Sequence, residues 1–335
     1  MRKKPSSALI VRSALFSLVT LSICAEYETR DSVKGFVDEV ATEEGFDPKQ
    51  LLRIFEQVEK KQRIIDLISR PAEKTKPWHE YREIFVNPAR IARGIQFWEE
   101  NESALNRARL GFGIPAEIIV AVIGVETNYG RNTGSYRVID ALSTLAFDYP
   151  PRARFFRGEL RELLLLAREE DKDPLALVGS YAGAMGYGQF IPSSFRAYAI
   201  DFDGDGARDI WRNPTDAIGS VANYFSRHGW DGEGPIAVPV TVTDERADQF
   251  ANRGLKPKHS VWELRQAGVA LVSLPDETLG ALFRLENRGG WEYWLGLHDF
   301  YVVTRYNHSH MYALAVVQLS NAIQSRWGDE RTADR

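Results

Sequence analysis

The segment from Gly113 to Gly130 constrains the fold most, because it predicts a buried helix that carries one carboxylate. Pro115 suits the first turn of a helix, where its missing N–H costs nothing. Three apolar side chains and one glutamate then recur at helical spacing and so share one face: Ile119, Val122, Ile123 and Glu126. Since the other three are apolar, we expect Glu126 to lie on the buried side.

Glu126 falls in the last turn of this predicted helix, because Asn128, Tyr129 and Gly130 follow it as stop signals. Burial disfavours the charged form of a carboxylate, and the negative end of the helix dipole does the same. We therefore expect a carboxylic acid that keeps its proton near neutral pH, as a general acid must. The alternative is a solvated glutamate or a structural ion pair.

Length and charge set wide limits on function. The chain has 335 residues, enough for two or three domains with a sizeable core. Its apolar and charged fractions, 44% and 26%, are those of a globular protein. Because the net charge is only −4, a nucleic-acid partner is not expected.

The first 25 residues predict a signal peptide and therefore a periplasmic protein. Cations at residues 2 to 4 precede a ten-residue apolar run, Ala14 to Ile23, which is too short to span a bilayer. Cys24, the only cysteine, closes a stretch that resembles a bacterial lipobox.

Two fates of Cys24 remain open. Lipidation would make it the mature N-terminus and tie the protein to the outer membrane, but Ile23 departs from the Gly, Ala or Ser expected before the cysteine. Cleavage near Ala25 would instead release a free periplasmic protein. One acyl chain binds membranes only marginally, so the two fates differ physically.

Helical patterns dominate most of the chain. Asp47-Pro48 and Asn87-Pro88 each predict an N-cap followed by proline, and Asp173-Pro174 predicts the start of a further element. Helices are expected within residues 31–110 and over residues 136–147, 155–168, 216–228 and 309–326.

Residues 232 to 302 change character and predict a small α+β insertion. Strands are expected at residues 236–242, 269–274, 279–285 and 291–297, with a hairpin turn at residues 287–290. Short helices are expected near Phe250 and Trp262.

Residues 179 to 195 are rich in glycine. A phosphate loop is disfavoured, because no strand pattern precedes the segment and no Gly-Lys-Ser/Thr ends it. Glycine lets the backbone approach a ligand closely, and Ser180, Tyr187 and Gln189 are interleaved here. The pattern favours the floor of a polar cleft, and a packed helix junction is the alternative.

Residues 201 to 216 resemble a calcium loop. Positions 1, 3, 5 and 6 hold the expected types: Asp201, Asp203, Asp205 and Gly206. Asp209 stands at position 9, but position 12 is Arg212 instead of glutamate, so Asp216 would have to close the site. Three carboxylates this close repel without a cation. We expect a structural Ca²⁺, with a solvated acidic turn as the alternative.

Three stretches together resemble the B-type lytic murein transglycosylases, glycoside hydrolase family 103. They are Ile123 to Gly130, Gly183 to Ser194, and Tyr306-Asn307 with Tyr312. The resemblance is strongest over residues 111–231 and 300–323. It implies an α+β, mainly α fold with a lysozyme-like helical core, an N-terminal helical domain and a small inserted β-containing domain.

The domain limits expected from this resemblance follow the changes of pattern along the chain. They are a signal peptide (1–25), an N-terminal helical domain (26–110), a catalytic core with the calcium loop (111–231), the α+β insertion (232–302) and a C-terminal helix that completes the core (303–327).

The resemblance implies cleavage of the MurNAc-β-1,4-GlcNAc bond in peptidoglycan glycan strands without water, leaving 1,6-anhydro ends. By position, Glu126 would be the single acid and base. The implied sugar-cleft residues are Ser180, Gln189, Tyr224, Tyr306, Asn307 and Tyr312, and the implied calcium ligands are Asp201, Asp203, Asp205, Asp216 and the carbonyl of Ala207. Arg152 would contact substrate, although Pro151 replaces an arginine expected beside it. The linker before Asp216 is one residue longer than the family pattern.

This chemistry explains why the cleft motifs hold no second carboxylate. Ordinary glycosidases need two, about 5 to 10 Å apart. An internal hydroxyl nucleophile needs only one, provided that the N-acetyl group or nearby dipoles stabilise the oxocarbenium-like state. Two alternatives remain, a muramidase-type hydrolase and a non-catalytic peptidoglycan-binding protein. We expect a monomer with no organic cofactor.

Overall fold

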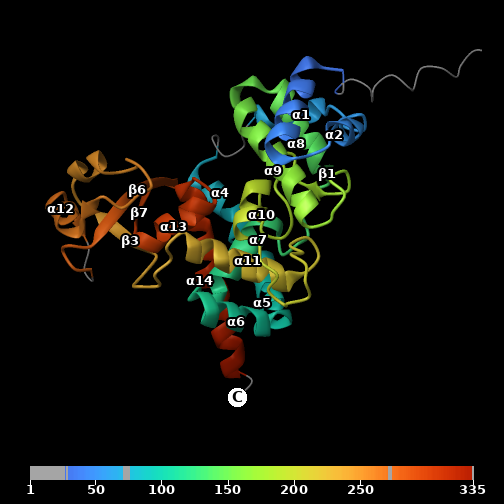
Figure 1. Ribbon diagram of the computed structural model, residues 1–335. Helices are drawn as coiled ribbons and strands as arrows, with labels where there is room; N and C mark the ends of the chain where they lie inside the picture. The colour runs from blue at the N-terminus through green and yellow to red at the C-terminus, as the bar shows by residue number, and fades with distance from the viewer. Residues whose placement is uncertain (1–26, 28, 71–75, 271–273, 334–335) are drawn as a thin grey trace, which may run out of the picture. The chain divides into compact units, whose positions relative to one another are not determined.

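The computed structural model describes residues 27, 29–70, 76–270 and 274–333. The predicted signal peptide and Cys24 lie outside the described residues. The chain divides between Lys60 and Lys61 into two units (Figure 1).

The first unit is a pair of helices, α1 (Asp31–Glu44) and α2 (Pro48–Phe55). Asp47 accepts a hydrogen bond from the Lys49 N–H at 2.9 Å, which confirms the predicted N-cap. The rings of Phe36 and Phe55 meet edge to face with centroids 6.0 Å apart. Apolar side chains of both helices are buried: Val33, Phe36, Val37, Val40, Leu51 and Phe55.

The second unit is mainly helical, and α7 (Ala116–Thr127) lies in its core. Every residue of α7 except Glu117 and Glu126 is buried, as expected of a helix that is apolar on all sides. The predicted helix is therefore confirmed, with Glu126 in its last turn. Pro115 is its N-cap, one position before the predicted place.

Further helices surround α7 or extend the unit. They are α3 (Gln62–Ile68), α4 (Trp78–Phe85), α5 (Pro88–Glu100), α6 (Glu102–Phe112), α8 (Val138–Asp148), α9 (Ala153–Glu169), α10 (Pro192–Tyr198), α11 (Pro214–Arg227), α13 (His298–Tyr306) and α14 (His310–Ala333). Helices α5, α6, α11 and α14 pack against α7. Asn87 caps α5 by accepting the Arg90 N–H at 3.0 Å, as its sequence predicts.

Two local predictions were wrong. Tyr136 and Arg137 were expected to be helical, but they form β1 and pair antiparallel with β2 (Val178–Gly179). Because that partner is distant in sequence, local periodicity could not reveal it. At Asp173-Pro174 the chain makes a turn, in which the Asp173 carboxylate accepts the Leu175 N–H at 2.9 Å, and no helix or strand begins there.

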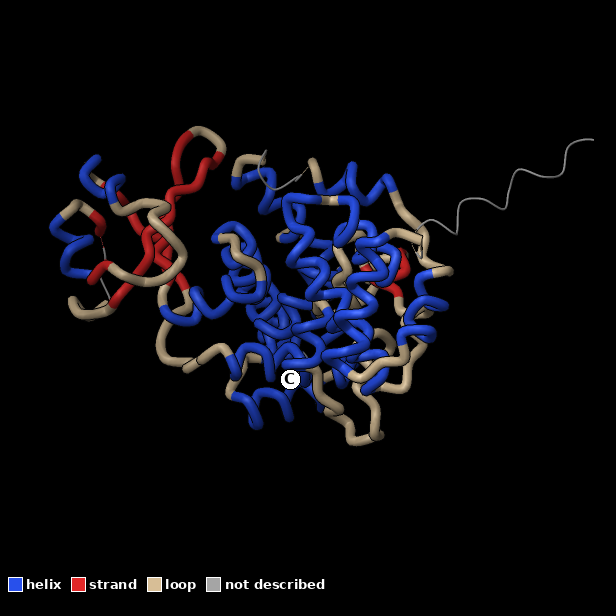
Figure 2. Tube along the Cα trace, turned by 45° about the horizontal axis from the view of Figure 1, so that its top comes forward, coloured by secondary structure: helices blue, strands red, loops and turns tan. Residues whose placement is uncertain are grey.

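The insertion between α11 and α13 contains a five-stranded antiparallel sheet of order β4-β6-β7-β3-β5 (Figure 2). Its strands are β3 (Ala237–Val242), β4 (His259–Ser260), β5 (Val269–Ala270), β6 (Leu279–Asn287) and β7 (Gly290–Gly296). Helix α12 (Val261–Gln266) contributes Val261 and Leu264 to the sheet's own small core. The predicted hairpin is confirmed, since Asn287 pairs with Gly290. Residues 271–273 of the strand expected at 269–274 lie outside the described residues.

The fold class is the one predicted, mainly α, and the described residues form two small sheets. The domain limits stay a prediction. Within the described residues no single helix is long and apolar enough to cross a membrane, although α6 and α7 meet such a test as a pair bent by 116°.

Candidate active site

Glu126 lies where α7 ends in an unusual backbone turn. Asn128 and Tyr129 have φ angles of 52° and 62°, and Gly130 has 83°. Left-handed backbone is uncommon outside glycine, so two such residues before a glycine must be held by their surroundings. The Tyr129 side chain folds back along the helix. A Cβ on Gly124 would lie 2.6 Å from its hydroxyl, so the motif needs glycine there.

Residues of α5 (Pro88–Glu100) hold this turn in place by hydrogen bonds. Arg90 donates a hydrogen bond from its guanidinium to the carbonyl of Gly124, and its own carbonyl accepts the Tyr129 hydroxyl at 3.0 Å. Arg93 donates to the Asn128 side chain at 3.1 Å. Cations at a helix C-terminus also complement the helix dipole. The backbone that carries Glu126 is therefore fixed from outside its own helix.

The Glu126 carboxylate is half-buried and has a direct partner on α14. The hydroxyl of Tyr312 donates to Oε1 of Glu126 at 2.6 Å. Tyr312 is 2% exposed, and burial, followed by the negative charge of Glu126, raises its pKa well above the usual value. The phenol therefore stays protonated and remains a hydrogen-bond donor at any physiological pH.

Tyr306 and Tyr224 form a second layer near the carboxylate. Burial and then the charge of Glu126 raise the pKa of Tyr306 well above its usual value. The Tyr306 hydroxyl donates to the carbonyl of Gly188 at 2.5 Å, and that of Tyr224 donates to the carbonyl of Arg305 at 2.5 Å. Their ring centroids are 4.7 Å apart. These hydroxyls therefore brace the backbone around the site.

Thr127 joins the end of α7 to the glycine-rich segment. Its hydroxyl accepts the Gly130 N–H at 3.0 Å and lies 2.9 Å from the carbonyl of Tyr187, to which it donates. The Tyr187 ring covers Gly130 so closely that a Cβ there would lie 2.3 Å from it. Because Thr127 is 1% exposed, this link is shielded from water.

Three further predicted residues are held by the local backbone. The Ser180 hydroxyl accepts the Ala184 N–H at 3.0 Å. Gln189 has a φ of 50° and donates its side-chain amide to the carbonyl of Gly186 at 3.0 Å. Asn307 ends α13 in extended backbone. Gln189 directly follows Gly188, the acceptor for Tyr306, so it belongs to the same neighbourhood.

Arg152 is placed elsewhere. It precedes α9 and lies over the Phe155 ring, 4.3 Å from the centroid. It lines a pocket of about 620 Å³ together with Glu159 and Ser193, and Glu126 is not among the lining residues. The structure therefore does not bring Arg152 together with the tyrosine cluster.

The acidic loop gathers three of its carboxylates. Oxygens of Asp201, Asp203 and Asp205 all lie within 4.8 Å of one another. Asp201 accepts the N–H groups of Gly206 at 2.8 Å and Gly204 at 2.7 Å, and these bonds lower its pKa. Such a set of oxygens suits a hard cation such as Ca²⁺.

Asp216 holds the backbone of the same loop by hydrogen bonds. It is fully buried, and its two oxygens accept the N–H groups of Phe202 and Asp209, each at 2.8 Å. Burial raises its pKa. The Ala207 N–H is bonded to Asp205 at 2.9 Å. The donor set thus fits a cation at Asp201, Asp203 and Asp205, while the oxygens of Asp216 are engaged with loop backbone.

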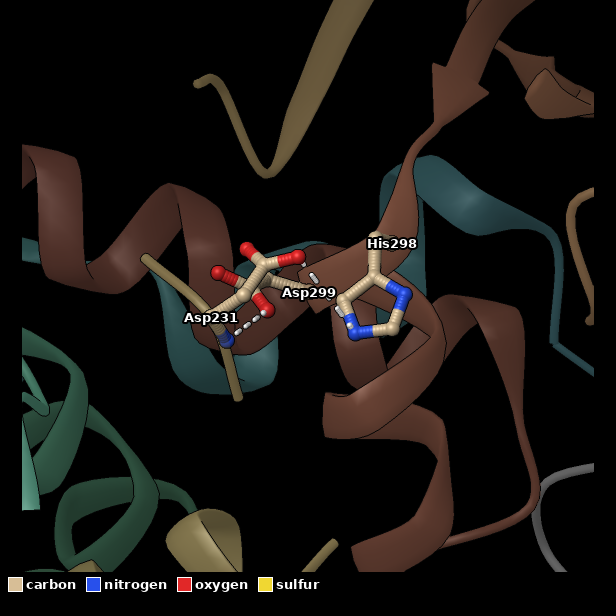
Figure 3. Close-up of side chains that lie close together, drawn as sticks. All are labelled: Asp231, His298 and Asp299. Atoms are coloured by element: carbon tan, nitrogen blue, oxygen red, sulfur yellow. Dashed lines mark hydrogen bonds and ion pairs between the residues drawn. The ribbon is translucent and has the colours of Figure 1, made fainter. Parts of the chain in front are cut away.

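A second cluster, unforeseen from the sequence, joins Asp231, His298 and Asp299 (Figure 3). The buried Asp299 carboxylate accepts the N–H groups of Asp231 at 3.2 Å and Gly232 at 3.0 Å. Nε2 of His298 lies 2.8 Å from the carbonyl of Gly229 and 3.6 Å from Asp231. Since these atoms already contact protein, the cluster is an anchor between the loop after α11 and the first turn of α13.

Sequence reasoning also missed Thr127 and Arg90. Thr127 directly follows Glu126, and a hydroxyl at a helix end is the available signal for a bridging role. Arg90 lies 34 residues before Gly124, and no local pattern links the two.

Comparisons with known proteins identify the family of this chain. Residues 28–321 match the family model described as Transglycosylase SLT domain. Membrane-bound lytic murein transglycosylase B of Escherichia coli (strain K12) is 45% identical over 312 residues, which cover 89% of this chain and 84% of that protein. The soluble lytic transglycosylase SltB1 of Pseudomonas aeruginosa is 56% identical, with a TM-score of 0.85 over 89% of this chain and 99% of that chain.

Escherichia coli lytic transglycosylase Slt35 is similar too. It is 44% identical, with a TM-score of 0.83 over 90% of this chain and 95% of that chain. The chain therefore belongs to the SLT-domain transglycosylases, and it is a lytic murein transglycosylase with the lysozyme-like, mainly α fold that its sequence predicts.

Proposed function

We propose that Glu126 is the single acid and base with which this lytic murein transglycosylase cleaves the MurNAc-β-1,4-GlcNAc bond and leaves 1,6-anhydroMurNAc ends. The observation that carries the proposal is the carboxylate at the end of α7 with the Tyr312 hydroxyl 2.6 Å from Oε1. A SltB3 structure from Pseudomonas aeruginosa, 30% identical to this chain, is in complex with NAG-NAM-pentapeptide, which supports such a glycan as substrate.

The reaction has two proton transfers through one group. Glu126 gives its proton to the glycosidic oxygen as the bond from the MurNAc anomeric carbon to that oxygen breaks. The ionised carboxylate then takes the proton of the muramyl 6-hydroxyl, whose oxygen forms the new bond to the anomeric carbon. Tyr312 stabilises the carboxylate between the two steps, because a hydrogen bond to a charged acceptor is stronger than one to a neutral acceptor.

Digestion of purified sacculi in ¹⁸O-labelled water tests the mechanism. We expect 1,6-anhydro-muropeptides without ¹⁸O, and no products from a folded Glu126→Gln variant. Reducing ends that carry ¹⁸O would identify a muramidase-type hydrolase instead. If the wild type bound sacculi and released no fragments, the protein would be a non-catalytic binder.

The remaining predicted residues complete the proposal. Substrate contacts in the sugar cleft would come from Ser180, Tyr187, Gln189, Tyr224, Tyr306, Asn307, Tyr312 and Arg152. A structural Ca²⁺ would bind Asp201, Asp203 and Asp205, with Asp216 and the Ala207 carbonyl completing the site. An Slt35 structure in complex with calcium supports this site.

The proposal also covers the cellular compartment in which the protein acts. The protein would work on peptidoglycan in the periplasm as a monomer, during cell-wall turnover. The name of the relative in Escherichia coli, which includes the word membrane-bound, supports this compartment. Lipidated Cys24 would hold the protein at the outer membrane, and cleavage near Ala25 would release it.

A further inference from the structure

A pocket of about 610 Å³ lies outside the Glu126 site, and we call it the hairpin pocket. Three elements far apart in sequence build its wall: α4, the β6–β7 hairpin and α14. Its lining is rich in charged and amide side chains, with one indole: His79, Arg82, Glu83, Asn287, Arg288, Glu292, Trp294, Gln318 and Asn321.

Helices α4 and α14 separate this pocket from the catalytic carboxylate. On α4, Tyr81 is buried and contributes to the electrostatic environment of Tyr312, whereas Arg82 is the next residue and faces the pocket. On α14, Tyr312 contacts Glu126, whereas Gln318 lines the pocket. Tyr312 and Gln318 are six residues apart on α14, so they point to different sides of that helix and lie about 9 Å apart along its axis.

The sheet side of the pocket is held in place by side-chain contacts. Phe283, which pairs with Trp294 across the hairpin, stacks on His310 of α14 with centroids 5.2 Å apart. The Trp294 indole N–H donates to Glu292, whose other oxygen accepts the Asn287 amide at 2.6 Å. Both carboxylate oxygens of Glu292 therefore already accept hydrogen bonds from neutral donors.

The two arginines of the pocket, Arg288 and Arg82, are held by weaker contacts than Glu292. Arg288 pairs with Glu83 at 2.7 Å, but both side chains are more than half exposed, and such surface pairs exchange partners at little cost. Arg82 donates its Nε–H to the Gln318 side chain, and no carboxylate of the described residues pairs with it. A guanidinium with an amide partner and an open pocket beside it favours a carboxylate ligand.

We propose that the hairpin pocket binds the peptide stem of the glycan strand being cleaved, with a stem carboxylate on Arg82. This rests on the function proposed above. A stem carries carboxylates and backbone amides, which match the arginines and the side-chain amides of Gln318 and Asn321. An extended pentapeptide spans up to about 17 Å, which exceeds the offset of about 9 Å along α14 between Tyr312 and Gln318.

The test compares glycan strands that carry pentapeptide stems with the same strands after enzymatic removal of the stems. We expect Arg82→Ala to lower kcat/KM about tenfold on stem-bearing strands, mainly through KM. On bare strands the variant should match the wild type. Arg82→Lys, which keeps the charge, should recover part of the loss. Arg265→Ala, which removes the ion pair between Arg265 of α12 and Asp276, is the matched control and should match the wild type on both substrates.

Equal losses on both substrates, or no loss on either, would overturn the proposal. A direct measurement uses the free stem pentapeptide, titrated calorimetrically into the catalytically silent Glu126→Gln protein. Binding should weaken about tenfold when Arg82→Ala is added, and unchanged binding counts against the pocket. A wild type that releases no anhydro product from either strand would sink the proposed function. Pentapeptide binding would still report on the pocket in that case.

Discussion

At the scale of single residues, the contact between Tyr312 and Glu126 best explains how one carboxylate can serve twice. The resemblance implied that Tyr312 lines the sugar cleft. Its hydroxyl lies 2.6 Å from Oε1 of Glu126, and the side chain is 2% exposed. That position suits a hydroxyl that holds the carboxylate.

The first prediction concerns the removal of the Tyr312 hydroxyl. Tyr312→Phe should lower kcat by about 10- to 100-fold, because hydrogen bonds to charged groups contribute about 1.5 to 3 kcal/mol. Tyr293→Phe is the matched control, since that phenol also donates to a carboxylate, Asp248 at 2.9 Å, in the inserted sheet. Release of anhydro-muropeptides gives the rates. An unchanged kcat for Tyr312→Phe would contradict the assigned role.

The second prediction concerns the buried hydroxyl of Thr127. Thr127→Val keeps the shape but leaves the Gly130 N–H and the Tyr187 carbonyl without this partner, at a cost of about 1 to 3 kcal/mol in the free energy of unfolding. Thr127→Ser should recover most of that loss. Urea unfolding measures both variants. If Thr127→Ser were as destabilising as Thr127→Val, the methyl group would matter as much as the hydroxyl, which would contradict the prediction.

At the scale of elements, local chemistry could be predicted and long-range pairing could not. The caps at Asp47 and Asn87 depend on neighbouring residues and were predicted correctly. The strand at Tyr136 exists because of Val178 and Gly179, so it was missed. In the same way, the position of Glu126 in its helix could be predicted, but its partner Tyr312 is 186 residues away. Only the family resemblance joined those two segments.

The third prediction concerns the acidic loop. Ca²⁺ at 100 times its dissociation constant should add about 2.7 kcal/mol to the free energy of unfolding. Asp203→Asn should remove most of this gain, whereas Asp244→Asn, which changes an exposed carboxylate in another turn, should keep it. Thermal unfolding with Ca²⁺ or with chelator provides the measurement. Equal stabilisation of all three proteins would place the cation elsewhere.

The fourth prediction follows from the anchor at Asp299. Burial, and then the charge of Asp231, raises the pKa of Asp299, while the hydrogen bonds from the N–H groups of Asp231 and Gly232, and then His298, act in the opposite direction. When the pKa is higher in the folded state than in the unfolded state, the protonated carboxyl stabilises the fold. This stabilisation is complete below the ordinary pKa of about 3.9 and is lost as the pH rises through the pKa of the folded state. The Asp299→Asn variant has no carboxyl group to titrate at this position. The stability of wild type relative to that variant should therefore fall as the pH rises from about 4 to 7.

Urea unfolding across this pH range checks the sign. Asp231→Asn removes the neighbouring charge that raises the pKa of Asp299, so it should make the slope shallower. Parallel stability curves for wild type and Asp299→Asn would mean that Asp299 does not titrate differently in the folded and unfolded states.

At the scale of the whole molecule, one buried helix organises a large helical unit around a single carboxylate. Helix α5 reaches the carbonyl of Gly124, two residues before Glu126, and α14, more than 200 residues later in the chain, reaches the Glu126 carboxylate. The inserted sheet has its own small core and contributes a wall of the hairpin pocket. Cleavage chemistry and recognition of the surrounding wall polymer can therefore reside in different parts of one unit.

The fifth prediction concerns where this molecule works. The first 25 residues predict export, so the mature chain should begin at residue 24 or later, by mass spectrometry of its N-terminus. If Cys24 is lipidated, Cys24→Ser should move the protein from the membrane to the soluble periplasmic fraction. Ile23→Gly restores the expected residue before the cysteine and should increase the membrane fraction, because the acyl chains supply the anchor. An intact Met1 in the cytoplasmic fraction would refute export altogether.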